Sequence, residues 1–293
     1  MASIEITTNI GCRNSCVYCP QDKFVGNYKK RSNIFLMSFD VFKICLDKTP
    51  LPIEVIFSGM SEPYTNKSCT EMIRYAYQRK RQVSLFTTLV GMEIEDIKEL
   101  EKISFKYFWV HLPSDGAYEK IKVNDKYLEI LKRLKRSPIK AYYHFRGKKI
   151  HPGLEGICRQ ETSQRWFGTR AGNIAIEECS LPKRKKGVIG CSRRLRDNVL
   201  LPNGDILLCC IDYGLKHILG NLLKEDYENL FKNEEFKKVE NGLKNESANI
   251  LCRYCDQFAY NISLFAKIHN SLTDIHDKES FYRFLKKISK KLE

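Results

Sequence analysis

Three cysteines stand close together in the stretch Gly11-Cys12-Arg13-Asn14-Ser15-Cys16-Val17-Tyr18-Cys19-Pro20, from which the fold of this 293-residue chain can be inferred. Their spacing is C-x3-C-x2-C, and they directly follow a β-rich run at residues 4–10. Three thiolates on one tight loop can hold three irons of a 4Fe–4S cluster and leave the fourth iron open to a ligand. Zinc is the alternative metal, but a zinc site needs a fourth ligand, and none lies nearby in the sequence.

The first half of the chain alternates between short β-rich runs and segments with helical periodicity. Strands are expected at residues 4–10, 53–58, 82–88, 107–112 and 140–146. The segments between them repeat apolar residues about every 3.6 positions, as amphipathic helices do. Ser38 and Asn124 stand where they would cap two of these helices. The alternation predicts an α/β fold with a parallel sheet or partial barrel, whose ligands bind at the carboxyl ends of the strands.

Two further motifs end the second and the fourth expected strands. They read Phe57-Ser58-Gly59-Met60-Ser61-Glu62-Pro63 and His111-Leu112-Pro113-Ser114-Asp115-Gly116. Together with the cysteine loop, they resemble the radical S-adenosylmethionine (SAM) superfamily, with its Gly-Gly-Glu-Pro and Ser-x-Asp-Gly elements. This chain has Ser61 in place of a glycine of the first element and Pro113 in place of the serine of the second.

The resemblance implies a partial (β/α)6 barrel in which SAM chelates the open iron. The reduced cluster then cleaves SAM to a 5′-deoxyadenosyl radical, which abstracts hydrogen from a substrate. The cluster ligands implied are Cys12, Cys16 and Cys19. The SAM contacts implied are Tyr18 near the adenine, Gly59, Met60, Ser61 and Glu62 at the amino group, and Ser114, with His111 as second choice, at the ribose or carboxylate.

Four more cysteines form a second group: Cys191, Cys209, Cys252 and Cys255. A β-hairpin with a turn at Asn203-Gly204 is expected over residues 198–211. The group resembles the SPASM and shorter twitch domains of radical SAM enzymes, and its spacing is similar to that of the 2-deoxy-scyllo-inosamine dehydrogenase type. Asn261 stands where a full SPASM domain continues with cysteine, so the resemblance implies one auxiliary 4Fe–4S cluster with four protein ligands. A structural zinc ribbon is the alternative.

The expected organisation has three parts. A radical SAM partial barrel would cover residues 1–180, a twitch or SPASM-like domain of hairpin plus helix residues 181–260, and a basic helical tail residues 261–293. Cys45 and Cys69 lie on apolar helical stripes, so we expect them in the core.

Composition narrows the class of protein further. Lys and Arg number 50 against 35 Asp and Glu, but they are spread along the chain without a nucleic-acid-binding motif. We therefore expect a solvated basic surface that suits an anionic or carbohydrate-like small molecule rather than a nucleic acid. Twelve cysteines favour metal binding or catalysis in a reducing compartment. Neither a secretory signal nor an apolar run of about 20 residues is visible, so a cytoplasmic protein without a membrane partner is expected.

Three functions remain open. In the first, the enzyme oxidises or epimerises a carbinol carbon of a carbohydrate, aminocyclitol or polyol, and in a dehydrogenation the auxiliary cluster accepts the second electron. In the second, it modifies a peptide or protein. The third is an RNA-binding or redox-sensing iron–sulfur protein without turnover.

Several residues outside the ligand sets are candidates for a part in the reaction. Arg170 stands near the expected end of the last barrel strand, where a guanidinium can clamp the SAM carboxylate or an anionic substrate. Cys158, Cys179 and Cys210 are candidate hydrogen donors for an epimerisation, and the sequence names no catalytic base. The resemblance implies a flavodoxin- or ferredoxin-type reductant.

Overall fold

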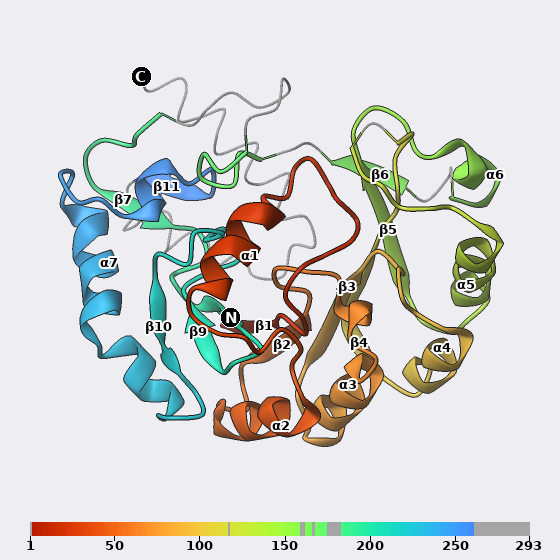
Figure 1. The fold of residues 1–293 in the computed structure, drawn as a ribbon, viewed down its shortest axis with the longest axis horizontal. Helices are drawn as coiled ribbons and strands as arrows, with labels where there is room; N and C mark the ends of the chain where they lie inside the picture. The colour runs from red at the N-terminus through yellow and green to blue at the C-terminus, as the bar shows by residue number, and fades with distance from the viewer. Residues whose placement is uncertain (1, 117, 159–161, 166–167, 175–182, 261–293) are drawn as a thin grey trace, which may run out of the picture.

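The computed structural model describes residues 2–116, 118–158, 162–165, 168–174 and 183–260 (Figure 1). Its strands are β1 Ser3–Ile6, β2 Glu54–Phe57, β3 Val83–Thr87, β4 Phe105–His111, β5 Ala141–Arg146, β6 Thr162–Arg165, β7 Ile189–Cys191, β8 Asp197–Leu200, β9 Asp205–Leu207, β10 Ile218–Asn221 and β11 Phe258–Tyr260. Its α-helices are α1 Gln21–Lys29, α2 Phe39–Lys48, α3 Cys69–Gln78, α4 Ile94–Leu100, α5 Asp125–Lys135, α6 Glu155–Cys158 and α7 Glu234–Lys244. Short 3-10 helices are η1 Pro63–Thr65, η2 Pro152–Leu154, η3 Tyr227–Phe231 and η4 Leu251–Tyr254.

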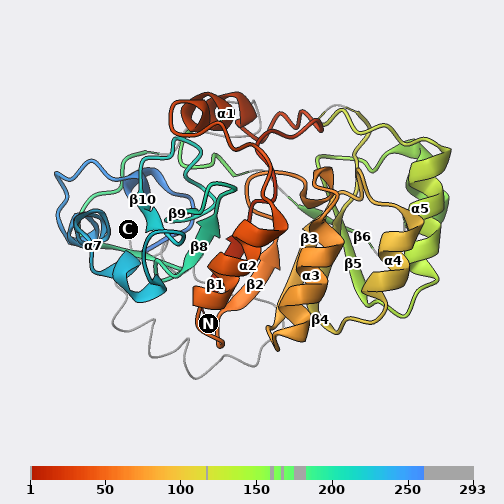
Figure 2. The same ribbon diagram turned by 60° about the horizontal axis from the view of Figure 1, so that its bottom comes forward.

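One sheet organises the molecule. Its nine strands lie in the order β10-β9-β8-β1-β2-β3-β4-β5-β6. Strands β1 to β6 are parallel to their neighbours, and β8 also pairs in parallel with β1. Helices α2 to α5 follow the outer side of this curved sheet (Figures 1 and 2). The α/β partial barrel expected from the sequence is therefore confirmed.

The helices form where the periodicity and the caps place them. The Ser38 hydroxyl accepts a hydrogen bond from the Val41 N–H at the start of α2, and the Asn124 side chain accepts one from the Tyr127 N–H at the start of α5. Cys45 of α2 and Cys69 of α3 are fully buried, as expected for small apolar side chains.

The expected C-terminal hairpin is confirmed as β8 and β9, and it is part of the barrel sheet. Ser3 of β1 is the register partner of Asp197 of β8, and β9 and β10 continue the sheet in antiparallel pairing. Gly204 in the turn has φ of +85°, a conformation that side chains other than glycine rarely adopt. Strands β7 and β11 form a separate antiparallel pair.

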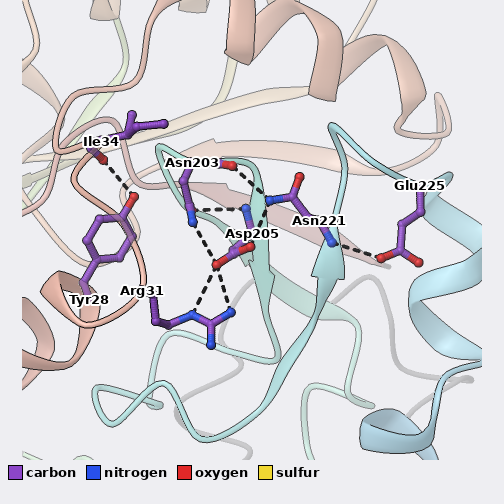
Figure 3. A network of polar contacts seen from close by, with 7 residues as sticks. All are labelled: Tyr28, Arg31, Ile34, Asn203, Asp205, Asn221 and Glu225. Atoms are coloured by element: carbon purple, nitrogen blue, oxygen red, sulfur yellow. Dashed lines mark hydrogen bonds and ion pairs between the residues drawn. The ribbon is translucent and has the colours of Figure 1, made fainter.

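A polar network fixes the hairpin turn against the segment that follows α1 (Figure 3). The Asp205 carboxylate accepts hydrogen bonds from Asn203 and Asn221, each at 2.9 Å, and from Nη2 of Arg31 at 3.2 Å. Phe24 and Tyr28 of α1 pack in the same apolar cluster as residues of β8 and β9. The helix after the first cysteine loop is thereby tied to the hairpin that leads to Cys209.

Two expected features lie outside the described residues, namely Cys179 and the basic helical tail at 261–293. Among the helices of the described part, none is long and apolar enough to cross a membrane.

Candidate functional site

The first cysteine site is the loop between β1 and α1. Its three thiols, Cys12, Cys16 and Cys19, are half-buried and close enough to influence one another electrostatically. The Cys19 N–H donates to the Cys16 carbonyl at 2.9 Å, and Ser15 has φ of +48°, which tightens the loop. Burial raises the pKa of Cys12 and raises that of Cys16 to about 12. A bound cation must therefore displace the protons of these thiols.

The turn after β2 lies beside this loop and requires its glycine. Gly59 has φ of +69°, and a Cβ there would lie 2.2 Å from the Thr7 hydroxyl. That hydroxyl accepts the Met60 N–H at 3.1 Å. The Ser61 hydroxyl donates to the Asn9 carbonyl at 2.6 Å, so the residue that replaces a glycine ties the turn to the segment before Cys12.

Glu62 is a buried carboxylate held by the end of β3. It accepts hydrogen bonds from the Thr87 hydroxyl at 2.6 Å, the Thr88 hydroxyl at 2.6 Å and the Thr88 N–H at 2.7 Å. The Tyr64 N–H at 3.3 Å is the fourth donor to this carboxylate. The Thr88 hydroxyl also accepts from the Asn14 side chain of the cysteine loop. Burial raises the pKa of Glu62, whereas these hydrogen bonds favour its ionised form.

The ends of β4 and β5 supply two imidazoles to the same region. The Tyr18 hydroxyl lies 3.0 Å from Nε2 of His111, and Nδ1 of His111 lies 3.1 Å from Nε2 of His144. The Arg146 guanidinium lies over the Tyr18 ring, 5.5 Å from its centroid. The structure thus brings His111 against the cysteine loop, whereas Ser114 is fully buried and its N–H donates to Glu119.

The second cysteine site gathers residues from three separate parts of the C-terminal region. Cys191, Cys209, Cys252 and Cys255 line one cavity. Burial raises the pKa of Cys252 to about 12 and that of Cys255 to about 11, and neighbouring thiols add to both shifts. Nowhere in the described chain are three Cys, His, Asp or Glu side chains placed to hold a single metal ion.

His217 supports this second site, and no sequence motif indicated it. Its carbonyl accepts the Leu208 N–H at 2.9 Å, and its Nε2 accepts the Leu251 N–H at 3.1 Å. The ring proton therefore lies on Nδ1, which is 2.6 Å from Glu235. Leu208 and Leu251 directly precede Cys209 and Cys252, so one neutral imidazole fixes the spacing of two ligand segments.

Arg170 lies between the two cysteine sites. Its guanidinium is 5.9 Å from the centre of the Tyr213 ring and within electrostatic range of Cys19. The described part of the chain offers it no ion-pair partner. Thr169 is hydrogen-bonded to Asp256, the residue after Cys255, and Arg170 itself has φ of +50°. Such strain persists only where the surroundings impose it.

The candidate donor thiols occupy different environments. Cys210 is buried beside Arg193, whose Nη1 lies 3.2 Å both from its sulfur and from Oε1 of Glu5. Cys158 is buried in the main hydrophobic core. The sequence analysis missed Tyr213 and Arg193, because neither stands at a motif position.

Comparisons with known proteins agree with this architecture. Residues 191–256 match the family model of SPASM, an iron–sulfur cluster-binding domain. A search of the curated proteins gave no match. The structure of BtrN in complex with AdoMet and 2-DOIA is 15% identical over 87% of this chain and 93% of that chain, with a TM-score of 0.57.

Two structures with bound peptides are similar to a comparable degree. Streptococcus suis SuiB bound to precursor peptide SuiA has a TM-score of 0.59 and 12% identity, over 87% of this chain and 69% of that chain. The structure of anSMEcpe with bound AdoMet and Cp18Cys peptide has a TM-score of 0.56 and 13% identity, over 87% and 86%. Residues 191–256 thus match an iron–sulfur cluster-binding domain, and the chain shares its fold with the BtrN, SuiB and anSMEcpe structures.

Proposed function

We propose that this chain reductively cleaves SAM, abstracts hydrogen from a small hydroxyl-bearing substrate, and so oxidises or epimerises a carbinol carbon. One observation carries the proposal. Arg170 is in electrostatic range of Cys19 in the set of three thiols, Arg193 is in range of Cys209 in the set of four, and the two arginines are in range of each other.

The first site fits a 4Fe–4S cluster, because three soft thiolates on one loop leave one iron without a protein ligand. Such a cluster would supply one electron to bound SAM, which would be cleaved to methionine and a 5′-deoxyadenosyl radical. In our proposal Gly59, Met60, Ser61 and Glu62 hold the methionine end of SAM. Tyr18 and His111 hold its adenosine end, with Ser114 as the alternative contact. These residues fix one orientation, which confines abstraction to one substrate atom.

The second site fits a cluster with four protein ligands. Such a cluster has no open iron, which suits electron transfer rather than substrate binding. The cavity between the cysteines is also lined by Leu195, Leu208, Ile211 and Leu251. An apolar lining limits the access of water and thereby influences the redox potential of a cluster.

The arginines support a substrate that is anionic or rich in hydroxyl groups. Arg193 is paired with Glu5, whereas Arg170 has no ion-pair partner among the described residues, so an anionic group of the substrate or the SAM carboxylate can pair with it. A carbinol that becomes a carbonyl loses a hydrogen atom from carbon, a proton from oxygen and one further electron. For an epimerisation we assign Cys210 as hydrogen donor, because it is buried beside both arginines.

A peptide substrate is the second candidate. It is supported by the SuiB and anSMEcpe structures, which hold peptides and share the fold of this chain. The first candidate is supported by the BtrN structure with 2-DOIA, of which this chain covers 93%, against 69% of SuiB.

The test is SAM cleavage by anaerobically reconstituted, reduced protein in the presence of sugar phosphates, aminocyclitols or peptides. We expect 5′-deoxyadenosine to form, and deuterium from a carbinol-deuterated sugar or aminocyclitol to appear in it. Arg170→Met should raise the KM of the active compound, whereas Arg170→Lys should raise it less. Stimulation by peptides alone would favour the second candidate, and the complete absence of 5′-deoxyadenosine would refute both.

A further inference from the structure

The hydroxyl of Tyr213 contacts the first cysteine site from the C-terminal half of the chain. It lies 3.5 Å from the sulfur of Cys19, a residue 194 positions away; the protonated thiol donates to the hydroxyl, and the O–H donates to the sulfur once a cluster has displaced the thiol proton. We propose that Tyr213 tunes the redox potential of the first cluster. The tyrosine belongs to the segment that follows Cys209, a ligand of the second cluster. This inference rests on the proposed cluster at Cys12, Cys16 and Cys19.

The turn after Cys209 holds the Tyr213 backbone in place. The Asp212 N–H donates to the Cys209 carbonyl at 3.2 Å, and the Tyr213 N–H to the Ile211 carbonyl at 3.0 Å. The fully buried Asp212 carboxylate accepts the N–H groups of Lys216 at 3.0 Å and His217 at 2.8 Å. Four residues after a ligand of the second site, the chain is therefore fixed on both sides of the tyrosine.

The Tyr213 ring is equally confined. It packs edge-on against Phe24 of α1, with ring centres 6.2 Å apart, and the Arg170 guanidinium covers its face. Phe24 lies five residues after Cys19, so the ring packs on the helix that directly follows the loop. Removal of the hydroxyl alone leaves these ring contacts in place.

A donor at this position has a definite effect on a cluster. Reduction adds negative charge to the cluster and its sulfurs, so a hydrogen bond to a ligand sulfur stabilises the reduced state more than the oxidised state. Cys19 accepts a second donor, Nε2 of Gln21 at 3.2 Å, which belongs to the N-terminal half. Tyr213 should therefore make the first cluster easier to reduce, and the C-terminal half of the chain supplies this part of the tuning.

The experiment compares Tyr213→Phe with the wild type in a redox titration of the reconstituted protein followed by electron paramagnetic resonance. The signal that changes on addition of SAM identifies the first cluster. At a fixed applied potential, we expect the ratio of reduced to oxidised first cluster to fall about three- to tenfold. This range corresponds to the free energy of one neutral hydrogen bond. The signal of the second cluster should titrate as in the wild type.

Tyr254→Phe is the matched control, because Tyr254 stands between Cys252 and Cys255 and, in the described part of the chain, the side-chain hydrogen bonds of the Cys19 sulfur are those with Tyr213 and Gln21. Gln21→Leu removes the other donor and should shift the titration in the same direction. An unchanged ratio in Tyr213→Phe, or an equal shift in Tyr254→Phe, would overturn the inference. A failure of the proposed function can be told apart from these two outcomes, because the wild type itself would then lack a SAM-sensitive signal.

Discussion

Glu62 illustrates how much the site depends on single side chains. Its carboxylate accepts four hydrogen bonds from β3 and from its own turn, and only 4% of the residue is exposed. A carboxylate fixed in this way holds the turn 59–61 against the cysteine loop. A ligand amino group near it meets a negative charge whose position is already determined.

We therefore expect Glu62→Gln to impair both stability and SAM binding. The amide nitrogen replaces one of the two oxygens and cannot accept that oxygen's hydrogen bonds, which come from Thr87 at Oε1 or from Thr88 at Oε2, so the variant should lose about 1–3 kcal/mol of unfolding free energy. SAM affinity, measured by calorimetry on the reconstituted protein, should fall by about 1.5–3 kcal/mol. Glu54→Gln is the control. Glu54 is a buried acid at the start of β2, and its carboxylate accepts hydrogen bonds from Ser84 and Lys106. Wild-type SAM affinity in Glu62→Gln would contradict the assignment.

The sequence indicated those residues whose roles depend on local order. Gly59, Ser61 and Glu62 stand in one short turn, and the three cysteines stand in one loop, so their spacing alone predicts that they meet. Tyr213, Arg193 and His217 act through contacts with Cys19, Glu5 and Leu251, which are far away along the chain. No spacing rule links such pairs, because only the folded sheet brings them together.

Among the secondary-structure elements, the β8–β9 hairpin connects the two cysteine sites. Its turn and strands were predictable from Asn203-Gly204 and the apolar runs around them. Its pairing with β1 was not, because pairing partners depend on tertiary packing rather than on the strand itself. Three of the four β8 residues are buried, so the strand needs a neighbour on each side.

Asp205 lies at the centre of this connection, and we expect Asp205→Asn to loosen it. The side chain is 9% exposed and accepts hydrogen bonds from Arg31, Asn203 and Asn221, so the loss of its charge should cost about 1–3 kcal/mol. Arg31→Ala should cost less than about 1 kcal/mol, because Arg31 is 41% exposed. Denaturant unfolding of the two variants measures the difference. Equal losses would show that the ion pair, and not the buried carboxylate, holds the turn.

At the level of the whole molecule, the sheet places the two sites in a fixed relation. The first site follows β1, and Cys209 of the second site follows β9, two strands away in the same sheet, whereas Cys191 ends β7 of the separate two-stranded pair. Arg170, Tyr213 and Cys210 lie in the region that both sites share. A substrate bound there would contact residues from both halves of the chain, which is why the site is incomplete without either half.

This arrangement predicts that the two sites contribute separately to a dehydrogenation. Replacement of Cys255 by Ala removes one of four ligands of the second site and leaves the first site intact, so iron per chain should fall from about eight to about four. Product should then fall more than 5′-deoxyadenosine, because hydrogen abstraction precedes the loss of the second electron. Cys158→Ala is the control, since that thiol is buried in the main hydrophobic core and is not among the expected cluster ligands. An equal loss of product and 5′-deoxyadenosine would argue against electron transfer to the second site, and deuterium from solvent in the product would identify an epimerisation instead.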